Sequence, residues 1–462
     1  MALQRIRDAL HNLIEFRTDQ ELERNLWRIL QSRPFQRLRR IKQLGFSELV
    51  YPGASHSRFA HSVGVFHTAR RLIEVIRRKE GESSRERFAL AAALVHDLGH
   101  GPFSHAFESV GKRLGLQLAD HERVSDLLIR DGEIAELLND EMGSGFAVDV
   151  ADVVKGEGNV TVHNAVVSSQ FDADRLDYMR RDRLMTGSEH SAIDFTWLMA
   201  NLQIGELRTG VDEEETSPVK TFVIGPKAIY AAEAYVLGLF QLYPTVYFHK
   251  ATRGAEKLFV ELMVRVFELA NDQSVCQTGL PDNHPIIRFA QNPDDLETVL
   301  RLDDAVIWGS LSLMADAKDR LVSEFSQRLR DRKLFKCIDV RTRVEHEFDP
   351  ESTGRADQID KIDACCGMIS EKLTTWIDAN WRDVPHVLID EEKRSPYKDD
   401  AGLLGRINVL TGGGELVDLK QRSRVVASLR DYRFLRAYHE QSDNVASSAI
   451  YDIINGEVEA CR

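Results

Sequence analysis

The hydrophobic positions in the first third of the chain recur with the period of an α-helix. In residues 59–79 the apolar side chains fall three or four positions apart, at Val63, Phe66, Ala69, Leu72 and Ile76. A helix turns once in about 3.6 residues, so this spacing places them on one face. Similar spacing predicts helix through residues 4–44, and the Ala- and Leu-rich run 85–98 predicts a buried helix.

The helical pattern continues along the chain and is followed, toward the C-terminus, by segments with the pattern of β-strands. Further helices are predicted over residues 163–184, 226–272 and 296–333. Between the first two, residues 203–224 carry an acidic run at 212–215 and a KTFVI segment, which predicts a loop and a short strand. Toward the C-terminus β-branched residues predict strands at 334–344, 385–391, 405–411 and 415–419, with a turn at 411–415.

These patterns predict a mainly α fold with two parts. A helical body covers residues 1–330, and a smaller α+β lobe covers residues 331–462. At 462 residues the chain is long enough for more than one hydrophobic core. There are no internal repeats and no low-complexity linkers.

Composition narrows the class of protein. Hydrophobic content of 43% and charged content of 29% are ordinary for a globular protein. No apolar run reaches the ~20 residues needed to span a bilayer, and we see no signal-peptide core, so we expect a cytoplasmic protein without a membrane partner. The net charge of −13 disfavours duplex nucleic acid. The five cysteines show no C-x-x-C spacing and are expected to be reduced.

The stretch HDLGHGPFSH at residues 96–105 carries candidate metal ligands. His96 and Asp97 end the predicted helix 85–98, where adjacent side chains can converge on one ion. His61 lies upstream, and an acidic cluster lies downstream, with Asp172, Asp174, Asp177 and Asp182. Mixed nitrogen and oxygen ligands suit Mn, Mg, Fe or Zn and leave positions open for water and substrate. Taken singly, each residue could instead serve the core or a surface ion pair.

Four motifs in this order resemble the HD phosphohydrolase superfamily, and within it the deoxynucleoside triphosphate triphosphohydrolase branch. They are YPGASHSRFAHSVGV at 51–65, HDLGHGPFSH at 96–105, DADRLDYMRRD at 172–182 and VYFHKATRG at 246–254. The resemblance implies a helical HD region at about residues 45–190, a divalent metal cofactor and release of triphosphate from dNTPs. It also implies homo-oligomers, from dimers to hexamers.

Under this resemblance the metal ligands are His61, His96, Asp97 and Asp174, while Asp172 and Asp177 support them. The other histidines suggest acid–base chemistry, because a carboxylate can orient an imidazole. Glu108 follows His105 by three residues on one helical face, and His121 and Glu122 form a second pair. We expect His105, positioned by Glu108, to protonate the leaving 5′-oxygen, and His100 and His121 to neutralise charge on the α-phosphate. The family usually has aspartate at the position of Glu108, so local capping is the alternative role for this glutamate.

The substrate's charges and deoxyribose suggest further contacts. Arg58 and Arg175 flank the metal ligands and could hold phosphate oxygens, and the resemblance adds Lys250. Leu239 stands where the family has another phosphate-binding arginine. For the nucleoside, Tyr178 and Tyr247 could wall the sugar and base, Asp182 could bind the 3′-hydroxyl, and Gln43 and Leu44 resemble the pair that excludes ribose.

A regulatory site is also suggested by the resemblance. Gln36 and Arg39 resemble residues that bind an activating guanine nucleotide between subunits, but Gln31 replaces the aspartate that reads guanine. We therefore expect activation by another nucleotide, such as a dNTP. Two alternatives to a dNTP triphosphohydrolase stay open: an HD enzyme acting on another nucleotide or a single strand, and a nucleotide-sensing module with little turnover.

Overall fold

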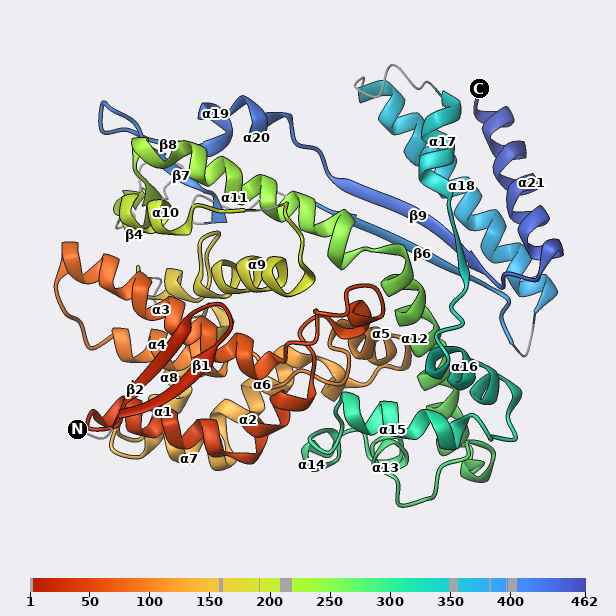
Figure 1. The fold of residues 1–462 in the computed structure, drawn as a ribbon, viewed down its shortest axis with the longest axis horizontal. Helices are drawn as coiled ribbons and strands as arrows, with labels where there is room; N and C mark the ends of the chain where they lie inside the picture. The colour runs from red at the N-terminus through yellow and green to blue at the C-terminus, as the bar shows by residue number, and fades with distance from the viewer. Residues whose placement is uncertain are drawn as a thin grey trace. The chain divides into compact units, whose positions relative to one another are not determined.

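A computed structural model describes residues 3–157, 161–190, 192–207, 218–348, 356–381, 384–395, 397 and 405–462. Helices dominate these residues and the sheets are small, which confirms the predicted mainly α fold class (Figure 1). Among the described helices, none combines the length and apolarity that a bilayer crossing requires.

Contacts group the chain into two compact units whose segments alternate along the sequence. The first unit comprises Met1–Val246, Asn292–Ala305 and Pro396–Arg430. The second comprises Tyr247–Gln291, Val306–Ser395 and Asp431–Arg462. The division into domains at residue 330 remains a prediction, and that position falls inside the second unit.

The N-terminus forms a β-hairpin where sequence periodicity predicted helix. Strand β1 (Leu3–Asp8) pairs with β2 (Asn12–Arg17) in antiparallel register, and α1 begins only at Glu21. Ile14 and Phe16 are fully buried, whereas Leu13 is exposed and Glu15 is half-buried. Alternation with a period of two is the pattern of a strand with one buried face, so the prediction of helix over residues 4–20 was wrong.

The helical part of the first unit is built around α3 (Arg58–Glu80). Helix α3 packs against α4 (Glu86–Val95) and α9 (Ala173–Thr186). The remaining helices of this unit are α1 (Glu21–Gln31), α2 (Arg33–Arg37), α5 (His105–Leu114), α6 (His121–Arg130), α7 (Gly132–Asn139), α8 (Phe146–Lys155), α10 (Phe195–Asn201), α11 (Ile229–Leu242), α14 (Leu296–Val299), α19 (Leu419–Arg422) and α20 (Arg424–Ser428). The predicted helices at 59–79 and 85–98 are confirmed, with small shifts at their ends.

A four-stranded sheet in the first unit joins distant parts of the chain. Its order is β3 (Leu202–Leu207), β4 (Val219–Ile224), β7 (Asn408–Leu410) and β8 (Leu416–Asp418). Strand β7 runs parallel to β4, and β7 and β8 are joined by the predicted turn, where the Thr411 amide donates to the Glu415 carbonyl. The acidic run predicted as a loop at 212–215 lies outside the described residues.

The second unit contains a three-stranded antiparallel sheet of order β5, β9, β6, with a cluster of buried apolar side chains between it and the helices α17, α18 and α21. These elements are β5 (Lys336–Asp339), α17 (Val340–Phe348), α18 (Ala356–Asn380), β6 (Val387–Arg394), β9 (Tyr432–His439) and α21 (Asn444–Cys461). The unit also holds α12 (Lys250–Asn271), α13 (Pro285–Gln291), most of α15 (Asp304–Met314) and α16 (Arg320–Arg330). The strand predicted at 334–344 is correct only to Asp339, because the chain turns helical at Val340.

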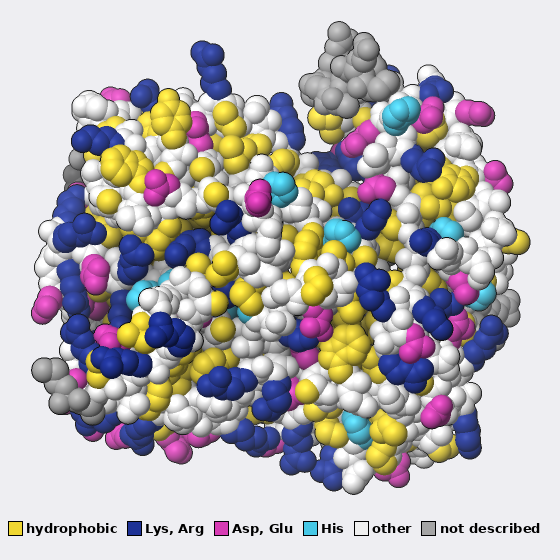
Figure 2. Space-filling view, in the orientation of Figure 1, with side chains coloured by type: hydrophobic (Ala, Val, Ile, Leu, Met, Phe, Trp, Pro, Cys, Tyr) yellow, Lys and Arg dark blue, Asp and Glu magenta, His cyan; other side chains and the backbone are white. Residues whose placement is uncertain are grey.

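Charged side chains of both signs are mixed on the visible face of the molecule. Figure 2 shows Lys and Arg side chains scattered over this face with Asp and Glu between them. The net charge of −13 is therefore not gathered into one acidic patch on this side.

Candidate metal centre and its surroundings

The four predicted metal ligands come from three helical segments of the first unit. His61 lies in the first turn of α3, and Asp174 lies in the first turn of α9. Each helix starts at a polar cap: the Ser57 hydroxyl accepts from the Ala60 amide, and the Asp172 carboxylate accepts from the Arg175 amide. His96 is the C-cap of α4, and Asp97 follows in the turn. Helix ends therefore present all four side chains.

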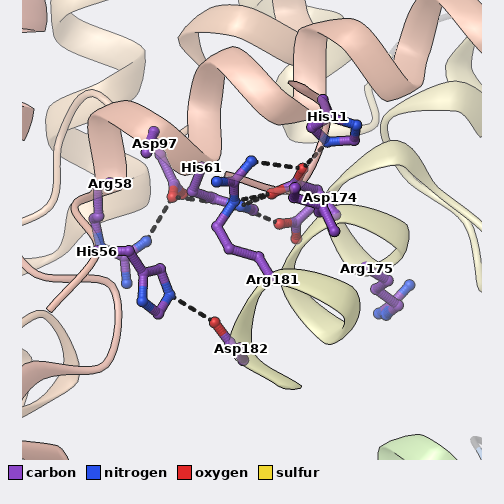
Figure 3. A network of polar contacts seen from close by, with 12 residues as sticks. His11, His56, Arg58, His61, Asp97, Asp174, Arg175, Arg181 and Asp182 are labelled. Carbon is purple, nitrogen blue, oxygen red and sulfur yellow. Dashed lines mark hydrogen bonds and ion pairs between the residues drawn. The ribbon is translucent and has the colours of Figure 1, made fainter. Parts of the chain in front are cut away.

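These side chains converge on one point, and Figure 3 shows three of them, His61, Asp97 and Asp174. Nε2 of His61 lies 2.9 Å from Oδ1 of Asp174, and Nε2 of His96 lies 3.7 Å from the same oxygen. The Asp97 carboxylate lies 3.4 Å from His96 Nε2 and 3.8 Å from His61 Nε2. His61, His96 and Asp174 form a group whose ligand atoms all lie within 4.8 Å of one another, close enough to share a metal ion.

The surroundings of His96 fit a bound cation. Its Nδ1 lies 3.1 Å from the Ala93 carbonyl oxygen, which can only accept, so this nitrogen carries a hydrogen. Its Nε2 is buried and has no hydrogen-bond partner among the described residues. That nitrogen faces the oxygens of Asp97 and Asp174 at 3.4 and 3.7 Å. A divalent cation between these groups would satisfy nitrogen and oxygen together.

His61 is held from behind by Asp177. Its Nδ1 donates to Oδ2 of Asp177 at 3.0 Å, on the side of the ring away from Asp174. Burial alone would lower the pKa of His61, but hydrogen bonds to Asp174 and Asp177 outweigh it and raise the pKa to about 10. A carboxylate behind a ligating imidazole fixes its tautomer and orientation.

A second cluster, the histidine cluster, lies next to the ligands and consists of His100, His105, Glu108 and His121. His105 Nδ1 donates to one Glu108 oxygen at 3.1 Å, and His121 Nδ1 donates to the other at 2.5 Å. The His100 and His121 rings are stacked with centroids 3.9 Å apart. His100 Nε2 lies 3.2 Å from Oδ1 of Asp97. The structure thus brings His100, His105, Glu108 and His121 together and links them to Asp97, a predicted metal ligand.

The members of the histidine cluster differ in the direction of their pKa shifts and in their exposure to solvent. Burial would raise the pKa of Glu108, but hydrogen bonds from His105 and His121 hold it below its usual range. Burial lowers the pKa of His121, yet the bond to Glu108 more than offsets this and raises it. Burial and the nearby charges of Arg58 and His121 keep the pKa of His100 well below its usual value. The side chain of His105 is 75% exposed, so it can exchange protons with solvent.

The turn between α4 and α5 shapes both clusters. Phe103 and Ser104 have φ of 53° and 52°, a region that non-glycine residues rarely adopt. Asp304 holds the turn by accepting from the Phe103 amide at 2.8 Å. At Gly99 a Cβ would lie 2.2 Å from the His121 carbonyl oxygen, so only glycine permits α6 to approach this closely.

Glu122 does not join the histidine cluster. It is exposed and lines a cavity of about 460 Å³ together with Glu108 and His121. Lys112, Gln117, Asp120 and Arg123 also line this cavity. Its walls therefore carry charges of both signs beside the histidine cluster.

The predicted phosphate-binding arginines are paired with acids in this structure. Arg58 is buried, and it donates to the Ser104 hydroxyl at 2.8 Å and to Asp97 Oδ2 at 2.5 Å. Arg175 donates to Asp172 Oδ2 at 2.9 Å and to the Ser169 carbonyl. Arg58 thus contacts a predicted metal ligand, whereas Arg175 is bonded to the N-cap of its own helix.

The other predicted substrate contacts are divided between the two units. Tyr178 and Asp182 lie on α9, and Asp182 accepts a hydrogen bond from His56 Nε2 at 2.8 Å. Gln43 and Leu44 are half-buried residues before α3, and the Gln43 amide donates to the His56 carbonyl. The remaining pair, Tyr247 and Lys250, belongs to the second unit.

The two predicted regulatory residues contact each other. Arg39 Nε donates to Oε1 of Gln36 at 2.9 Å, and its guanidinium lies over the Phe59 ring, 3.5 Å from the centroid. Gln36 in turn donates to the Leu30 carbonyl. Arg39 is exposed on the surface of the first unit.

Sequence reasoning missed several residues around the centre. His11, His56 and Arg181 each contact an aspartate of α9 (Figure 3). His11 is 166 positions from its partner Asp177, and His56 is 126 from Asp182. The spacing of His56 before His61 gave a weak local hint, but nothing near His11 in the sequence marks it as part of this site.

Family comparisons agree with this geometry. The HD domain family matches residues 58–179, and the HD associated region matches residues 214–437. YwfO of Bacillus subtilis, an uncharacterized protein, is 30% identical in an alignment 436 residues long, gaps included, that covers 92% of this chain and 89% of that protein. The chain therefore belongs to the HD-domain phosphohydrolases, and its cofactor is a divalent metal.

More distant relatives include enzymes with assigned names. The deoxynucleoside triphosphate triphosphohydrolase SAMHD1 of mouse is 28% identical in an alignment 373 residues long, gaps included, that covers 72% of this chain and 53% of that protein. A crystal structure of a phosphohydrolase from Bacteroides thetaiotaomicron superposes with a TM-score of 0.71 at 26% identity, covering 95% of this chain and all of that one. These similarities support a hydrolase acting through the metal centre.

Proposed function

We propose that this protein hydrolyses deoxynucleoside triphosphates to a deoxynucleoside and inorganic triphosphate. The observation that carries the proposal is the junction of the two clusters at Asp97. This carboxylate lies within 4 Å of His61 and His96 on one side and of His100 on the other. A metal centre and a set of proton donors can therefore act on the same phosphorus. The names of the SAMHD1 relatives support dNTPs as the substrate class.

His61, His96, Asp97 and Asp174 would hold the metal ion. When bound, the ion supplies Lewis-acid activation of water and of a phosphoryl oxygen. The identity of the metal stays open among Mn, Mg, Fe and Zn, because imidazole and carboxylate ligands suit all four. Asp177 keeps the His61 ring in the orientation that presents Nε2 to the ion.

His105 is proposed as the general acid. Its Nδ1–H is held by Glu108, which leaves Nε2 to face the leaving group. Water attacks the α-phosphorus, the bond from phosphorus to the 5′-oxygen breaks, and His105 gives its proton to that oxygen. The exposed ring then regains a proton from solvent. His121 contributes positive charge near the α-phosphate, and His100 contributes a hydrogen bond. Glu108 takes the place of Glu122 as the carboxylate partner of His121.

The remaining contacts are proposed on the same basis. Arg58, Arg175 and Lys250 would bind phosphate oxygens. Tyr178 and Tyr247 would flank the sugar and base, Asp182 would accept from the 3′-hydroxyl, and Gln43 with Leu44 would exclude a 2′-hydroxyl. Gln36 and Arg39 would bind an activating nucleotide between subunits of a homo-oligomer.

Product analysis tests the proposal directly. The full chain with Mn²⁺ is incubated with each dNTP, singly and as mixtures that could activate it, and the products are separated by chromatography. We expect deoxynucleoside and intact triphosphate from the wild type and none from Asp174→Ala. Release of pyrophosphate or monophosphate would indicate a different phosphoester reaction, and no turnover under any mixture would favour nucleotide sensing.

A variant pair tests the general acid. His105→Ala should lower kcat by about 10²–10⁴-fold, the usual contribution of a positioned acid, while bound metal stays unchanged. The matched control is His190→Ala, which removes another exposed histidine of the first unit. Equal turnover in His105→Ala and His190→Ala would overturn the assignment.

A further inference from the structure

The turn of the N-terminal hairpin inserts a histidine beside the metal centre. His11 lies between β1 and β2, yet the exposed fraction of its side chain is only 3%. Its Nε2 lies 2.6 Å from Oδ1 of Asp177. An ionised carboxylate can only accept, so Nε2 of His11 is the donor. The hairpin thus makes a charge-assisted hydrogen bond to α9.

The turn that carries His11 is itself fixed to α9. The backbone amides of Leu10 and His11 donate to Oδ1 of Asp8 at 2.9 and 2.8 Å. The other oxygen of Asp8 accepts from Arg181 Nη1 at 2.8 Å. Arg181 is nearly fully buried and also binds Asp177. Backbone and side chains together therefore set the position of the His11 ring.

Hydrogen-bond donors surround the Asp177 carboxylate completely. Oδ1 accepts from His11 Nε2 and from Arg181 Nη2 at 3.1 Å. Oδ2 accepts from His61 Nδ1 at 3.0 Å and from Arg181 Nε at 2.7 Å. A carboxylate has about four lone-pair positions, so these four bonds leave it one orientation. That orientation holds His61 with Nε2 toward Asp174.

We propose that His11 is a positioning residue of the metal centre, which acts through Asp177 on the ligand His61. The proposal rests on the ligand set given under the proposed function. Without the His11 donor, Oδ1 of Asp177 keeps only the 3.1 Å bond to Arg181 Nη2, so the carboxylate group can rotate. The His61 ring, which donates to this carboxylate, then loses its fixed orientation. The N-terminal hairpin is then part of the metal site, although it supplies no ligand.

Metal affinity, rather than turnover, tests this role. The full apo chain is titrated with Mn²⁺, and free Mn²⁺ is read by electron paramagnetic resonance. Partners behind metal ligands typically change affinity by about 10–100-fold, so His11→Ala should weaken Mn²⁺ binding by that factor. His11→Gln should recover most of the affinity, because its amide nitrogen reaches about as far as Nε2. His11→Asn is one methylene shorter and should not recover it.

Arg5→Ala is the matched control. Arg5 lies on β1 in an exposed pair with Glu15, so its loss perturbs the hairpin without touching Asp177. Wild-type Mn²⁺ affinity in His11→Ala, or equal weakening in Arg5→Ala and in both His11→Gln and His11→Asn, would overturn the proposal. Because the readout is metal binding, a result that moves the substrate away from dNTPs leaves this test intact.

Discussion

Gly64 shows how tightly the groups behind the metal centre are packed. It lies on α3, three residues after His61, and a Cβ there would lie 2.2 Å from both Asp177 Oδ1 and Arg181 Nη2. Both neighbours are buried and hydrogen-bonded, so neither can move at low cost. The position therefore requires glycine for space, even though glycine weakens a helix interior.

Gly64→Ala should accordingly destabilise the protein and weaken metal binding. Overpacking costs about 1–3 kcal/mol, which exceeds the gain of up to about 1 kcal/mol from replacing glycine in a helix. The control is Gly367→Ala in α18, where a Cβ would meet nothing within 4 Å and the helix should gain stability. Urea unfolding and Mn²⁺ titration of both variants measure the difference. Unchanged stability in Gly64→Ala would contradict this account of the packing.

His67 is expected to make stability depend on pH. Burial, with His11 and nearby arginines, lowers the pKa of His67 to about 4. Between that value and about 6.5 the unfolded chain binds a proton that the folded chain does not, so stability falls as pH falls through this range. Going from pH 7 to pH 5, the loss should be at most about 2 kcal/mol, and less where solvent screens the partly exposed ring.

The variant His67→Phe isolates this effect. It keeps an aromatic ring against His11, whose centroid lies 4.8 Å away, and removes the buried Nδ1 that has no partner among the described residues. The free energy of unfolding of wild type and variant is measured in urea at pH 7 and pH 5. At pH 5 the free energy of unfolding of the variant should rise relative to that of the wild type. A pH-independent difference would show that His67 is not the source.

At the scale of elements, side-chain caps at the helix N-termini fix where the helices around the candidate metal centre begin. Polar caps begin the helices that bear His61 and Asp174, and Asp120 does the same for α6, which bears His121. Asp120 Oδ1 accepts from the amides of Glu122 and Arg123 at 2.9 and 3.2 Å. Such caps can be recognised in a sequence because they act within three residues.

Asp120→Ala should cost about 1 kcal/mol of unfolding free energy, the usual loss for an N-cap. Asp120→Ser retains an acceptor at the same place and should lose less. Urea denaturation of the two variants beside wild type measures this difference. Equal losses would mean that the carboxylate stabilises α6 by some route other than capping.

At the scale of the whole molecule, the metal should stabilise the folded chain. A ligand at 100 times its dissociation constant adds about 2.7 kcal/mol to a state that alone binds it. Mn²⁺ should therefore raise the thermal midpoint of the wild-type apo protein, and a chelator should reverse the rise. His96→Ala combined with Asp97→Ala should remove most of the shift. An equal shift in this double variant would place the stabilising ion elsewhere.

Sequence predicted the helices and the strands unequally well. The helices 59–79 and 85–98 were predicted because their apolar spacing reports one buried face. The N-terminal hairpin was missed because its short alternation around Ile14 and Phe16 was read with the helical pattern that follows. Strand β9 was not anticipated, although it is the central strand of its sheet. Short strands carry few residues in which to show a period, so neighbouring patterns obscure them.

What the sequence determined by itself is the chemistry that is local along the chain. Adjacent His96 and Asp97, the turn residues after them and the caps of α3 and α9 act over a few positions, so residue order alone specifies them. The order of the four motifs then indicated the HD family, which the comparisons confirm.

Only the tertiary structure decided how distant groups meet. In the folded chain His11 is hydrogen-bonded to Asp177, Arg58 is hydrogen-bonded to Asp97, and strand β7 pairs with β4. Such contacts depend on how whole helices and strands pack, and no local propensity encodes that packing. The candidate metal ligands could therefore be proposed from the sequence, whereas the groups that contact them from distant parts of the chain could be found only in the folded chain.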